Sequence, residues 1–199
     1  MQLLETIRFE KGEFSNLVFH QDRMNKSRRV IFNCEDEINL FKLLHEQSNS
    51  ICDTNLYKCR IIYNSGVKKI EFIPYKIPDI NQLKLVICDE IEYGHKYLDR
   101  QKIEKLLDKK GKADDIIIVK NGLITDSSTA NLLFNNGNHW VTPAFPLLKG
   151  TQRAKLLEEE KIQVVDIRPS DLHNFKIVRF INAMLRFEDK IDVLIENVS

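Results

Sequence analysis

The sequence predicts an α+β fold in which most of the sheet is antiparallel. The first observation is that apolar runs repeatedly flank short turn signals, which is the pattern of β-hairpins. Three such turns are Asn64-Ser65-Gly66, Asn121-Gly122 and Asn135-Asn136-Gly137. The second observation is that only a few segments have helical spacing, and these are scattered between the hairpins. Hairpins with a few helices packed against them are typical of an α+β protein.

The first half of the chain is predicted to contain two hairpins and two helices. In order, these are strands over residues 3–10 and 14–19, helices over residues 20–31 and 35–47, and strands over residues 56–63 and 67–75. Phe19, Met24 and Ile31 are the expected inward positions of the first helix. The second helix is the clearer one, because its apolar residues recur at helical spacing and acidic residues occupy its first turn.

A change of composition at residues 78–82 predicts a boundary between two domains, residues 1–80 and 81–199. The elements expected beyond it are a buried strand over residues 83–88, a charged helix over 101–110, strands over 115–120, 132–134 and 140–142, a helix over 150–160, a strand over 162–167, a short helix from 169 and a strand over 176–181. Hairpin signals therefore recur in both halves, and the α+β prediction applies to each.

The composition indicates a globular protein and argues against two kinds of partner. Of the 199 residues, 43% are hydrophobic, enough to bury a substantial core. Basic and acidic residues nearly cancel to a net charge of +1, which gives no support for a nucleic-acid or membrane surface. The four cysteines, Cys34, Cys52, Cys59 and Cys88, lack metal-ligand spacing, and no signal peptide is visible at Met1. We therefore expect reduced thiols in a cytoplasmic protein.

Lys96 and Asp126 are the first two candidates for chemistry. Lys96 follows the apolar strand and lies between Tyr93 and Tyr97, where a shielded amine could act as nucleophile and base. Taken alone, Lys96 is more simply interpreted as a surface lysine. Asp126 precedes Ser127 in a sequence typical of turns and caps. As a functional group, its carboxylate would keep the ring nitrogen of a cofactor protonated.

Two further segments could bind an anion. Gly150-Thr151-Gln152-Arg153 opens a predicted helix, whose free N–H groups and dipole attract anions, although a plain helix start is the alternative. Arg23 could hold a phosphate through its planar guanidinium, or be solvated like its neighbours Lys26, Arg28 and Arg29. These basic residues lack the interleaved aromatics of a nucleic-acid surface. An amine, a carboxylate and an anion site are the three groups that pyridoxal phosphate requires.

Taken together, these segments resemble the class IV aminotransferase family, the fold-type IV pyridoxal-phosphate enzymes. The segments that carry the resemblance, in chain order, are Leu4-Glu5-Thr6-Ile7-Arg8, residues 20–24, Lys96-Tyr97-Leu98-Asp99-Arg100, Thr125-Asp126 with Ala130-Asn131-Leu132, Gly150-Thr151-Gln152-Arg153 and Ile181-Asn182-Ala183-Met184. Each motif alone is weak, but six in the right order and at compatible spacing identify the family. The resemblance covers the chain from Leu4 to about Arg186.

The resemblance implies a role for each candidate residue. Lys96 corresponds to the lysine that forms the Schiff base with pyridoxal phosphate, and Asp126 to the glutamate that meets the pyridine nitrogen. Arg23, Gly150 with Thr151, and Asn182 with Ala183 correspond to the residues around the phosphate. Aspartate replaces glutamate at position 126, and Thr151-Gln152 replaces Ile-Thr, so side-chain contacts to the phosphate are expected to differ.

The resemblance also implies an architecture and an activity. It implies a small N-terminal α/β sandwich, a β-barrel-like C-terminal domain with the cofactor at their junction, and a homodimer. The favoured activity is that of aminodeoxychorismate lyase, which releases pyruvate from an amine substrate to give 4-aminobenzoate for folate synthesis; Asn182-Ala183 favours it. The alternative is an amino-acid aminotransferase of the branched-chain or D-amino-acid type. A catalytically weak or non-enzymatic member is a third possibility, because the leading hairpin of typical members is expected to be missing.

Overall fold

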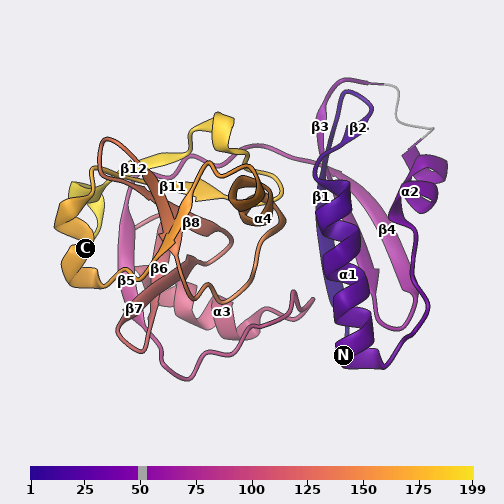
Figure 1. Cartoon of the computed structure of the whole chain (residues 1–199), viewed down its shortest axis with the longest axis horizontal. Helices are drawn as coiled ribbons and strands as arrows, with labels where there is room; N and C mark the ends of the chain where they lie inside the picture. The colour runs from indigo at the N-terminus through magenta and orange to yellow at the C-terminus, as the bar shows by residue number, and fades with distance from the viewer. Residues whose placement is uncertain (49–52) are drawn as a thin grey trace. The chain divides into compact units, whose positions relative to one another are not determined.

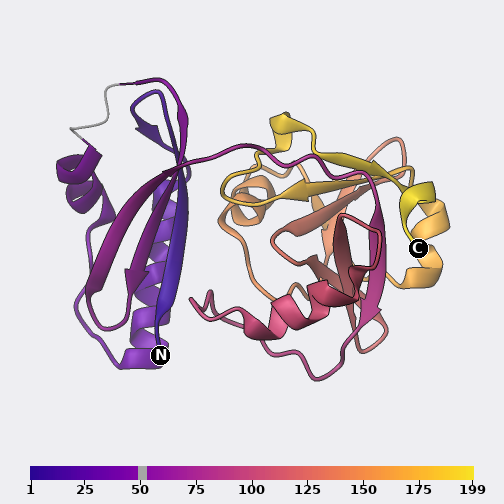
Figure 2. The same cartoon turned by 180° about the vertical axis from the view of Figure 1, so that it is seen from behind.

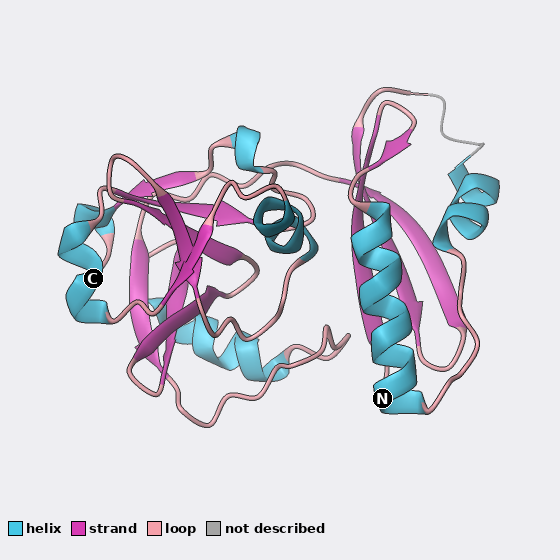
Figure 3. Ribbon diagram, in the orientation of Figure 1, coloured by secondary structure: helices cyan, strands magenta, loops and turns pink. Residues whose placement is uncertain are grey.

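The computed structural model describes residues 1–48 and 53–199, so Cys52 lies outside the described residues. The chain divides into two compact units. The N-terminal unit comprises Met1–Ile77 and His95–Asp99, and the C-terminal unit comprises Pro78–Gly94 and Arg100–Ser199. Each unit combines sheet with a few helices, as Figure 3 shows, and this confirms the predicted α+β class.

The N-terminal unit is an antiparallel sheet covered by helices. Its strands, in the order β2-β1-β3-β4, are β2 (Glu13–Phe14), β1 (Leu3–Glu10), β3 (Leu56–Tyr63) and β4 (Val67–Pro74), and its helices are α1 (Leu17–Phe32) and α2 (Leu40–Ser48). Figure 1 shows α1 lying along one face of this sheet, and Figure 2, from behind, shows the strands in front of it. The core between them is formed by Leu3, Ile7, Met24, Leu40, Leu44, Cys59, Ile61 and Tyr63. The predicted hairpin at residues 64–66 is confirmed by the pairing of β3 with β4.

Two predictions for this unit are wrong at their boundaries. The strand predicted over residues 14–19 ends at Phe14, because Asn16 takes the left-handed conformation, with φ of 56°, and α1 begins at Leu17. The helix predicted from residue 35 begins only at Leu40. Residues 36–38 are held in an irregular conformation by side chains of α1, since Arg28 binds Asp36 and the Asn25 amide pairs with the backbone of Ile38.

The inward face of α1 is also more polar than its sequence predicts. Met24 is fully buried, as expected, but Phe19 and Ile31 are only partly buried. The other buried side chains of this helix are His20, Asn25, Ser27 and Arg28. Polar groups are buried at a cost unless they have hydrogen-bond partners, so this face is built around hydrogen bonds rather than apolar packing.

The C-terminal unit is built on one curled sheet. Its main path is β10 (Gln163–Val165), β9 (Trp140–Pro143), β8 (Asn131–Asn135), β7 (Leu123–Ser127), β6 (Asp115–Lys120) and β5 (Leu83–Ile87), and β11 (Ile177–Ile181) pairs with β8 and β12 (Asp192–Leu194). The helices are α3 (Gln101–Leu107) and α4 (Thr151–Glu158), and the 3₁₀ segments are Asp108–Lys110, Pro169–Asn174, Phe187–Asp189 and Ile195–Asn197. The strands curl into a half-barrel (Figure 1).

Most predicted elements of this unit are confirmed. Asn121 and Gly122 both have positive φ, which is the geometry of the predicted tight hairpin turn between β6 and β7. Two strand pairs, β5 with β6 and β9 with β10, are parallel within the otherwise antiparallel sheet. β5 is only half-buried rather than fully buried as predicted: it ends the main path, and Ile87 is 71% exposed. No helix in the described part of the chain combines the length and apolar character that crossing a bilayer requires.

Candidate active site

Lys96 lies beside the first strand of the N-terminal unit. The short β2 pairs only with Phe9 and Glu10, which leaves the earlier part of that edge of β1 for another partner. Residues 96–98 take this place: the amide of Leu4 donates to the carbonyl of Lys96 at 2.9 Å, and Leu3 pairs with Tyr97. Backbone pairing of this kind fixes the position from which the Lys96 side chain extends.

A buried ionic cluster occupies the core-facing side of the same strand. Glu5 has no exposed surface and accepts hydrogen bonds from His20 Nδ1 at 2.6 Å and from Arg23 Nε and Nη2 at 2.9 and 2.6 Å. Burial alone would raise the pKa of Glu5, but the charges and hydrogen bonds of Arg23 and His20 outweigh burial and lower the pKa to about 2. Glu5 is therefore ionised at neutral pH.

The charge of Lys96 also acts on the pKa of His20. Burial lowers the pKa of His20, and the positive charges of Arg23 and Lys96 lower it further, while Glu5 opposes them. A neutral imidazole donates through one nitrogen only, so Nδ1–H directed at Glu5 leaves Nε2 as an acceptor. The cluster therefore brings Glu5 of β1 together with His20 and Arg23 of α1, and Lys96 is close enough to lower the pKa of His20.

Glu5 and His20 were not predicted as functional residues, although both stand in the motifs that carry the resemblance. The sequence does contain a pattern from which the buried ion pair of Glu5 could have been predicted. Alternate residues of a strand share one face, and Glu5 stands between Leu3 and Ile7 on the face that packs into the core. A carboxylate on an otherwise apolar face requires a charged partner, and that partner is Arg23.

Asp126 is buried in the C-terminal unit, on β7, with 5% of its surface exposed. Its Oδ1 accepts a hydrogen bond from Asn131 Nδ2 at 2.7 Å, and its Oδ2 accepts one from the amide of Leu148 at 3.0 Å. Burial raises the pKa of Asp126 to about 6, despite these hydrogen bonds and the nearby charge of Arg153, which lower it. No cation hydrogen-bonds to Asp126 in the described contacts, so this carboxylate is chemically suited to meet a protonated ring nitrogen.

Gly150 and Thr151 lie next to this carboxylate, at the start of α4. The amide of Gly150 donates to Asn131 Oδ1 at 3.1 Å, so the same asparagine contacts both Asp126 and the helix start. Thr151 and Gln152 are buried, with 3% and 4% exposed surface. The N–H groups and the dipole of a helix start attract anions, so the start of α4 is a candidate phosphate site.

Asn182 and Ala183 are brought to the same region by strand pairing. Ile181, the last residue of β11, stands opposite Asn131 in the antiparallel register of β8 and β11. Asn182 Nδ2 donates to the carbonyl of Thr129, and its Oδ1 accepts from the amides of Met184 and Leu185. The C-terminal unit thus gathers Asp126, Gly150, Thr151 and Asn182 around Asn131, a residue to which the sequence analysis gave no role.

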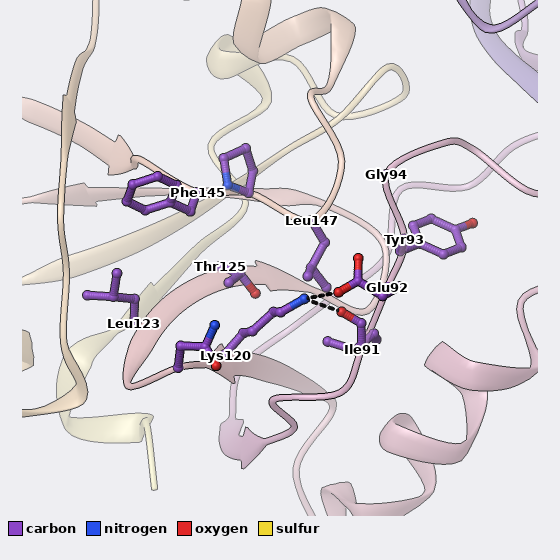
Figure 4. A pocket seen from close by; sticks show the side chains of 11 residues that line it. Ile91, Glu92, Tyr93, Gly94, Lys120, Leu123, Thr125, Phe145 and Leu147 are labelled. Carbon is purple, nitrogen blue, oxygen red and sulfur yellow. Dashed lines mark hydrogen bonds and ion pairs between the residues drawn. The ribbon is translucent and has the colours of Figure 1, made fainter. Parts of the chain in front are cut away.

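The pocket drawn in Figure 4 is a separate feature of the C-terminal unit. Its volume is about 420 Å³, and Lys120 within it donates to the carbonyl of Ile91 at 2.7 Å and pairs with Glu92 at 2.6 Å. None of the C-terminal candidate residues lines it. Thr125 does, but successive side chains of a strand point to opposite faces, so Asp126 faces away from this pocket. The candidate site is therefore not this pocket.

Comparisons with known proteins support the resemblance. The model of the family described as Amino-transferase class IV matches residues 2–187. An uncharacterized protein of Haemophilus influenzae is 41% identical over 184 residues, which are 92% of this chain and 97% of that protein.

Two solved structures are similar in fold. A Haemophilus somnus protein provisionally named a 4-amino-4-deoxychorismate lyase has a TM-score of 0.87 and 37% identity, covering 94% of this chain and 97% of that one. An aminotransferase from Brucella abortus bound to the cofactor PLP has a TM-score of 0.75 and 16% identity, covering 99% and 81%; this likeness concerns the fold. Because the family model matches nearly the whole length, this chain belongs to the class IV aminotransferases, a family of enzymes.

Proposed function

We propose that this protein is a pyridoxal-phosphate enzyme that converts 4-amino-4-deoxychorismate into 4-aminobenzoate and pyruvate. The observation that carries the cofactor assignment is the buried carboxylate of Asp126, held by Asn131 next to the start of α4. The lyase activity is supported by the provisional name of the Haemophilus somnus relative, which is 37% identical. The segment Asn182-Ala183 supports it as well, through its resemblance to the lyases.

The charges of Asp126 and Arg23 are complementary to those of the cofactor's ring nitrogen and phosphate. A carboxylate has about four acceptor positions, and Asp126 accepts from Asn131 and Leu148, so it retains capacity for a ring N–H. A pyridinium nitrogen would also provide the positive charge that favours the ionised form of this buried group. Arg23 is held in place by Glu5, and its planar guanidinium has the charge and geometry that suit a phosphate oxygen.

Lys96 is proposed as the residue that bonds to the cofactor and moves the proton. When bound, pyridoxal phosphate acts as an electron sink for negative charge that develops on the substrate. The Lys96 amine would take a proton from the substrate ring and return it to the departing pyruvate. Burial, helped by the neighbouring charges of Arg23 and Lys96, lowers the pKa of His20, so His20 is a weak base and competes poorly for this proton.

Phosphate binding is proposed for residues of both described clusters. Arg23, fixed by Glu5, would supply a charge-assisted hydrogen bond. The start of α4 at Gly150 and Thr151 and the loop at Asn182 and Ala183 would contact the phosphate close to the Asp126 cluster, while the amide of Gly150 itself remains bonded to Asn131 Oδ1. We also propose two domains, residues 1–80 and 81–199. The protein is further proposed to be a cytoplasmic homodimer that acts on a small-molecule amine.

The alternative proposal is an amino-acid aminotransferase that uses the same residues, and it rests on the family description. A lyase needs one substrate only, whereas an aminotransferase needs a keto acid to accept the amino group. Purified enzyme loaded with pyridoxal phosphate should produce 4-aminobenzoate and pyruvate from aminodeoxychorismate without added keto acid. If alanine, glutamate or a branched-chain amino acid bleaches the cofactor band, 2-oxoglutarate or pyruvate restores it, and aminodeoxychorismate is unchanged, the aminotransferase assignment replaces the lyase.

A further inference from the structure

One side-chain amide connects the carboxylate of Asp126 to the start of α4. Asn131 Nδ2 donates to Asp126 Oδ1 at 2.7 Å and to the carbonyl of Leu148 at 2.8 Å. Asn131 Oδ1 accepts from the amide of Gly150 at 3.1 Å. These hydrogen bonds form a closed ring, because the amide of Leu148 donates to the second oxygen of Asp126 at 3.0 Å. Both donors and the acceptor of this amide are therefore used within the cluster.

The backbone at Gly150 is shaped to the same amide. A Cβ atom placed on Gly150 would collide with Oδ1 of Asn131. The φ of Gly150 is −72°, which any residue can adopt, so the requirement for glycine is steric and not conformational. The close approach and the hydrogen bond both place Oδ1 of Asn131 directly against the backbone of Gly150, at the first residue before α4.

We propose that Asn131 is a positioning residue that holds the carboxylate of Asp126 and the first turn of α4 in one fixed relation. This rests on the proposed function, in which Asp126 meets the ring nitrogen of the cofactor and the start of α4 meets its phosphate. The two ends of a rigid cofactor must be bound at a set separation. One planar amide bonded to both binding groups fixes that separation more tightly than two unconnected contacts would.

Asn131 also contributes to the charge of the carboxylate. Its Nδ2 donates to Asp126, and the charge of Arg153 of α4 also favours the ionised form. The guanidinium of Arg153 is itself held by Thr142 and the carbonyl of Pro143 and does not bond to Asp126 in the described contacts. Removal of the amide donor should therefore raise the pKa of Asp126.

The steric part of the proposal is tested in cofactor-free protein by combining two substitutions. Gly150→Ala should lower Tm sharply in the wild-type background and only slightly in the Asn131→Ala background, where the colliding oxygen is gone. A Gly150→Ala variant that fails to fold while the double variant folds also supports the proposal. Equal losses of Tm in both backgrounds would overturn it, because Gly150 would then be required for a reason unrelated to Asn131.

The electrostatic part is tested by titrating the Asp126 carboxyl carbon by NMR, again without cofactor. Asn131→Ala should raise its pKa by about one unit, the effect of losing one hydrogen bond to a charged group. Asn131→Asp keeps an acceptor for Gly150 but replaces the donor by a carboxylate, so the two acids should titrate as a pair with a larger upward shift. Asn135→Ala is the matched control, since Asn135 ends the same strand and its side chain bonds only to the Gly137 and His139 backbone in the described contacts. An unchanged Asp126 titration in Asn131→Ala would contradict the proposal.

Cofactor binding distinguishes this inference from the proposed function. Wild-type protein and Asn135→Ala should bind pyridoxal phosphate equally, and Asn131→Ala should bind it about tenfold more weakly. If wild-type protein binds no pyridoxal phosphate, the proposed function fails, while the Tm and NMR results still decide the coupling of Asp126 to α4. If wild type binds and Asn131→Ala binds equally well, the positioning role of Asn131 is refuted and the proposed function stands.

Discussion

Arg23 and Glu5 form a two-point ion pair inside the N-terminal unit, with Arg23 Nε and Nη2 donating to the two different oxygens of Glu5. The guanidinium is thereby held in one plane, from α1 onto β1, and only 15% of the Arg23 side chain is exposed. An arginine fixed in this way loses little further side-chain freedom when it binds a ligand. The pair therefore links the stability of the unit to the proposed phosphate contact.

The first prediction concerns stability in acid. The pKa of Glu5 is about 2 in the folded protein and near 4.5 when the chain is unfolded. A lowered folded-state pKa contributes stability that is present above pH 4.5 and lost as the pH falls toward 2. Glu5→Gln should reduce the free energy of unfolding by about 3 kcal/mol at pH 7, and its difference from wild type should vanish near pH 2. Urea unfolding across this range, with exposed Glu13→Gln as the control, measures it. A constant difference at all pH values would contradict the assignment.

The second prediction concerns Arg23 and cofactor affinity. A hydrogen bond to a charged group contributes about 1.5–3 kcal/mol, so Arg23→Ala should weaken pyridoxal-phosphate binding roughly ten- to a hundredfold. Arg29→Ala is the control, since Arg29 lies on the same helix but is half-exposed and pairs with Glu37. Absorbance titration with the cofactor gives both affinities. An Arg23→Ala variant with unchanged affinity would show that Arg23 serves only its pairing with Glu5.

The third prediction concerns the covalent attachment. Purified protein loaded with pyridoxal phosphate should be yellow, and borohydride should fix the cofactor on the peptide that contains Lys96. Lys96→Ala should remove both the colour and the label, whereas Lys102→Ala, on an exposed position of α3, should leave them unchanged. Mass spectrometry of the digested protein locates the label. A label on Lys102 or any other lysine would refute the role of Lys96.

The fourth prediction concerns the cost of burying Asp126. Its pKa is raised from 3.8 to about 6 by burial, so its contribution to stability is present below pH 3.8 and is lost as the pH rises through about 6. Relative to wild type, Asp126→Asn should therefore gain about 3 kcal/mol of unfolding free energy between pH 4 and pH 8, while the cost of placing its NH2 against the donor of Asn131 or Leu148 is the same at both pH values. Unfolding free energies at the two pH values measure this change, and an equal difference from wild type at both would exclude a charge effect.

The same residue should show the opposite behaviour in catalysis. Asp126→Ala should bind the cofactor but lose most turnover, because no carboxylate keeps the ring nitrogen protonated. Asp126→Glu should retain much of the activity. Fully active Asp126→Ala enzyme would place the required carboxylate elsewhere. Functional sites often contain a group, such as Asp126, that destabilises the cofactor-free protein but is needed for catalysis when the cofactor is bound.

The fifth prediction concerns Arg179, which lies outside the candidate site. Its guanidinium lies 4.4 Å from the ring centre of Trp140 and 4.6 Å from that of Phe187, and it binds both oxygens of Asp192. Lysine cannot reproduce the two-point bond or the stacking. Arg179→Lys should lower the free energy of unfolding by roughly 1–3 kcal/mol, while exposed Arg29→Lys should have little effect. Chemical denaturation measures both, and equal effects would exclude a special role for Arg179.

Local sequence patterns predicted the hairpins well because the information lies within a few residues. At Asn121-Gly122, both residues adopt the positive φ that Asn and Gly tolerate, and the strands on either side follow. The same reasoning failed at residues 35–39. Their helical spacing is genuine, but Arg28 and Asn25 of α1 hold this segment outside the helix through hydrogen bonds that no local pattern contains.

The candidate site divides in the same way. The sequence by itself determined which residue types are available: a lysine after an apolar strand, an acid before a strand, and a glycine at a helix start. Their order and spacing were sufficient to identify the family. Residue types, their order and their spacing can be read without knowing which residues are close in space, because motifs and periodicities are properties of the linear sequence.

Only the tertiary structure decided which partners each charge has. Glu5 meets His20 and Arg23 because α1 packs on β1, and Asn131 meets Gly150 because β8 and the start of α4 lie together. The contacts of Glu5 with cations lower its pKa, whereas burial raises the pKa of Asp126 against the weaker opposing effect of its hydrogen bonds and of Arg153, although both carboxylates are buried to a similar degree. The physical reason is that the charge of a buried acid depends on whether a cation or only neutral donors hydrogen-bond to it, and that is settled by packing between segments distant in sequence.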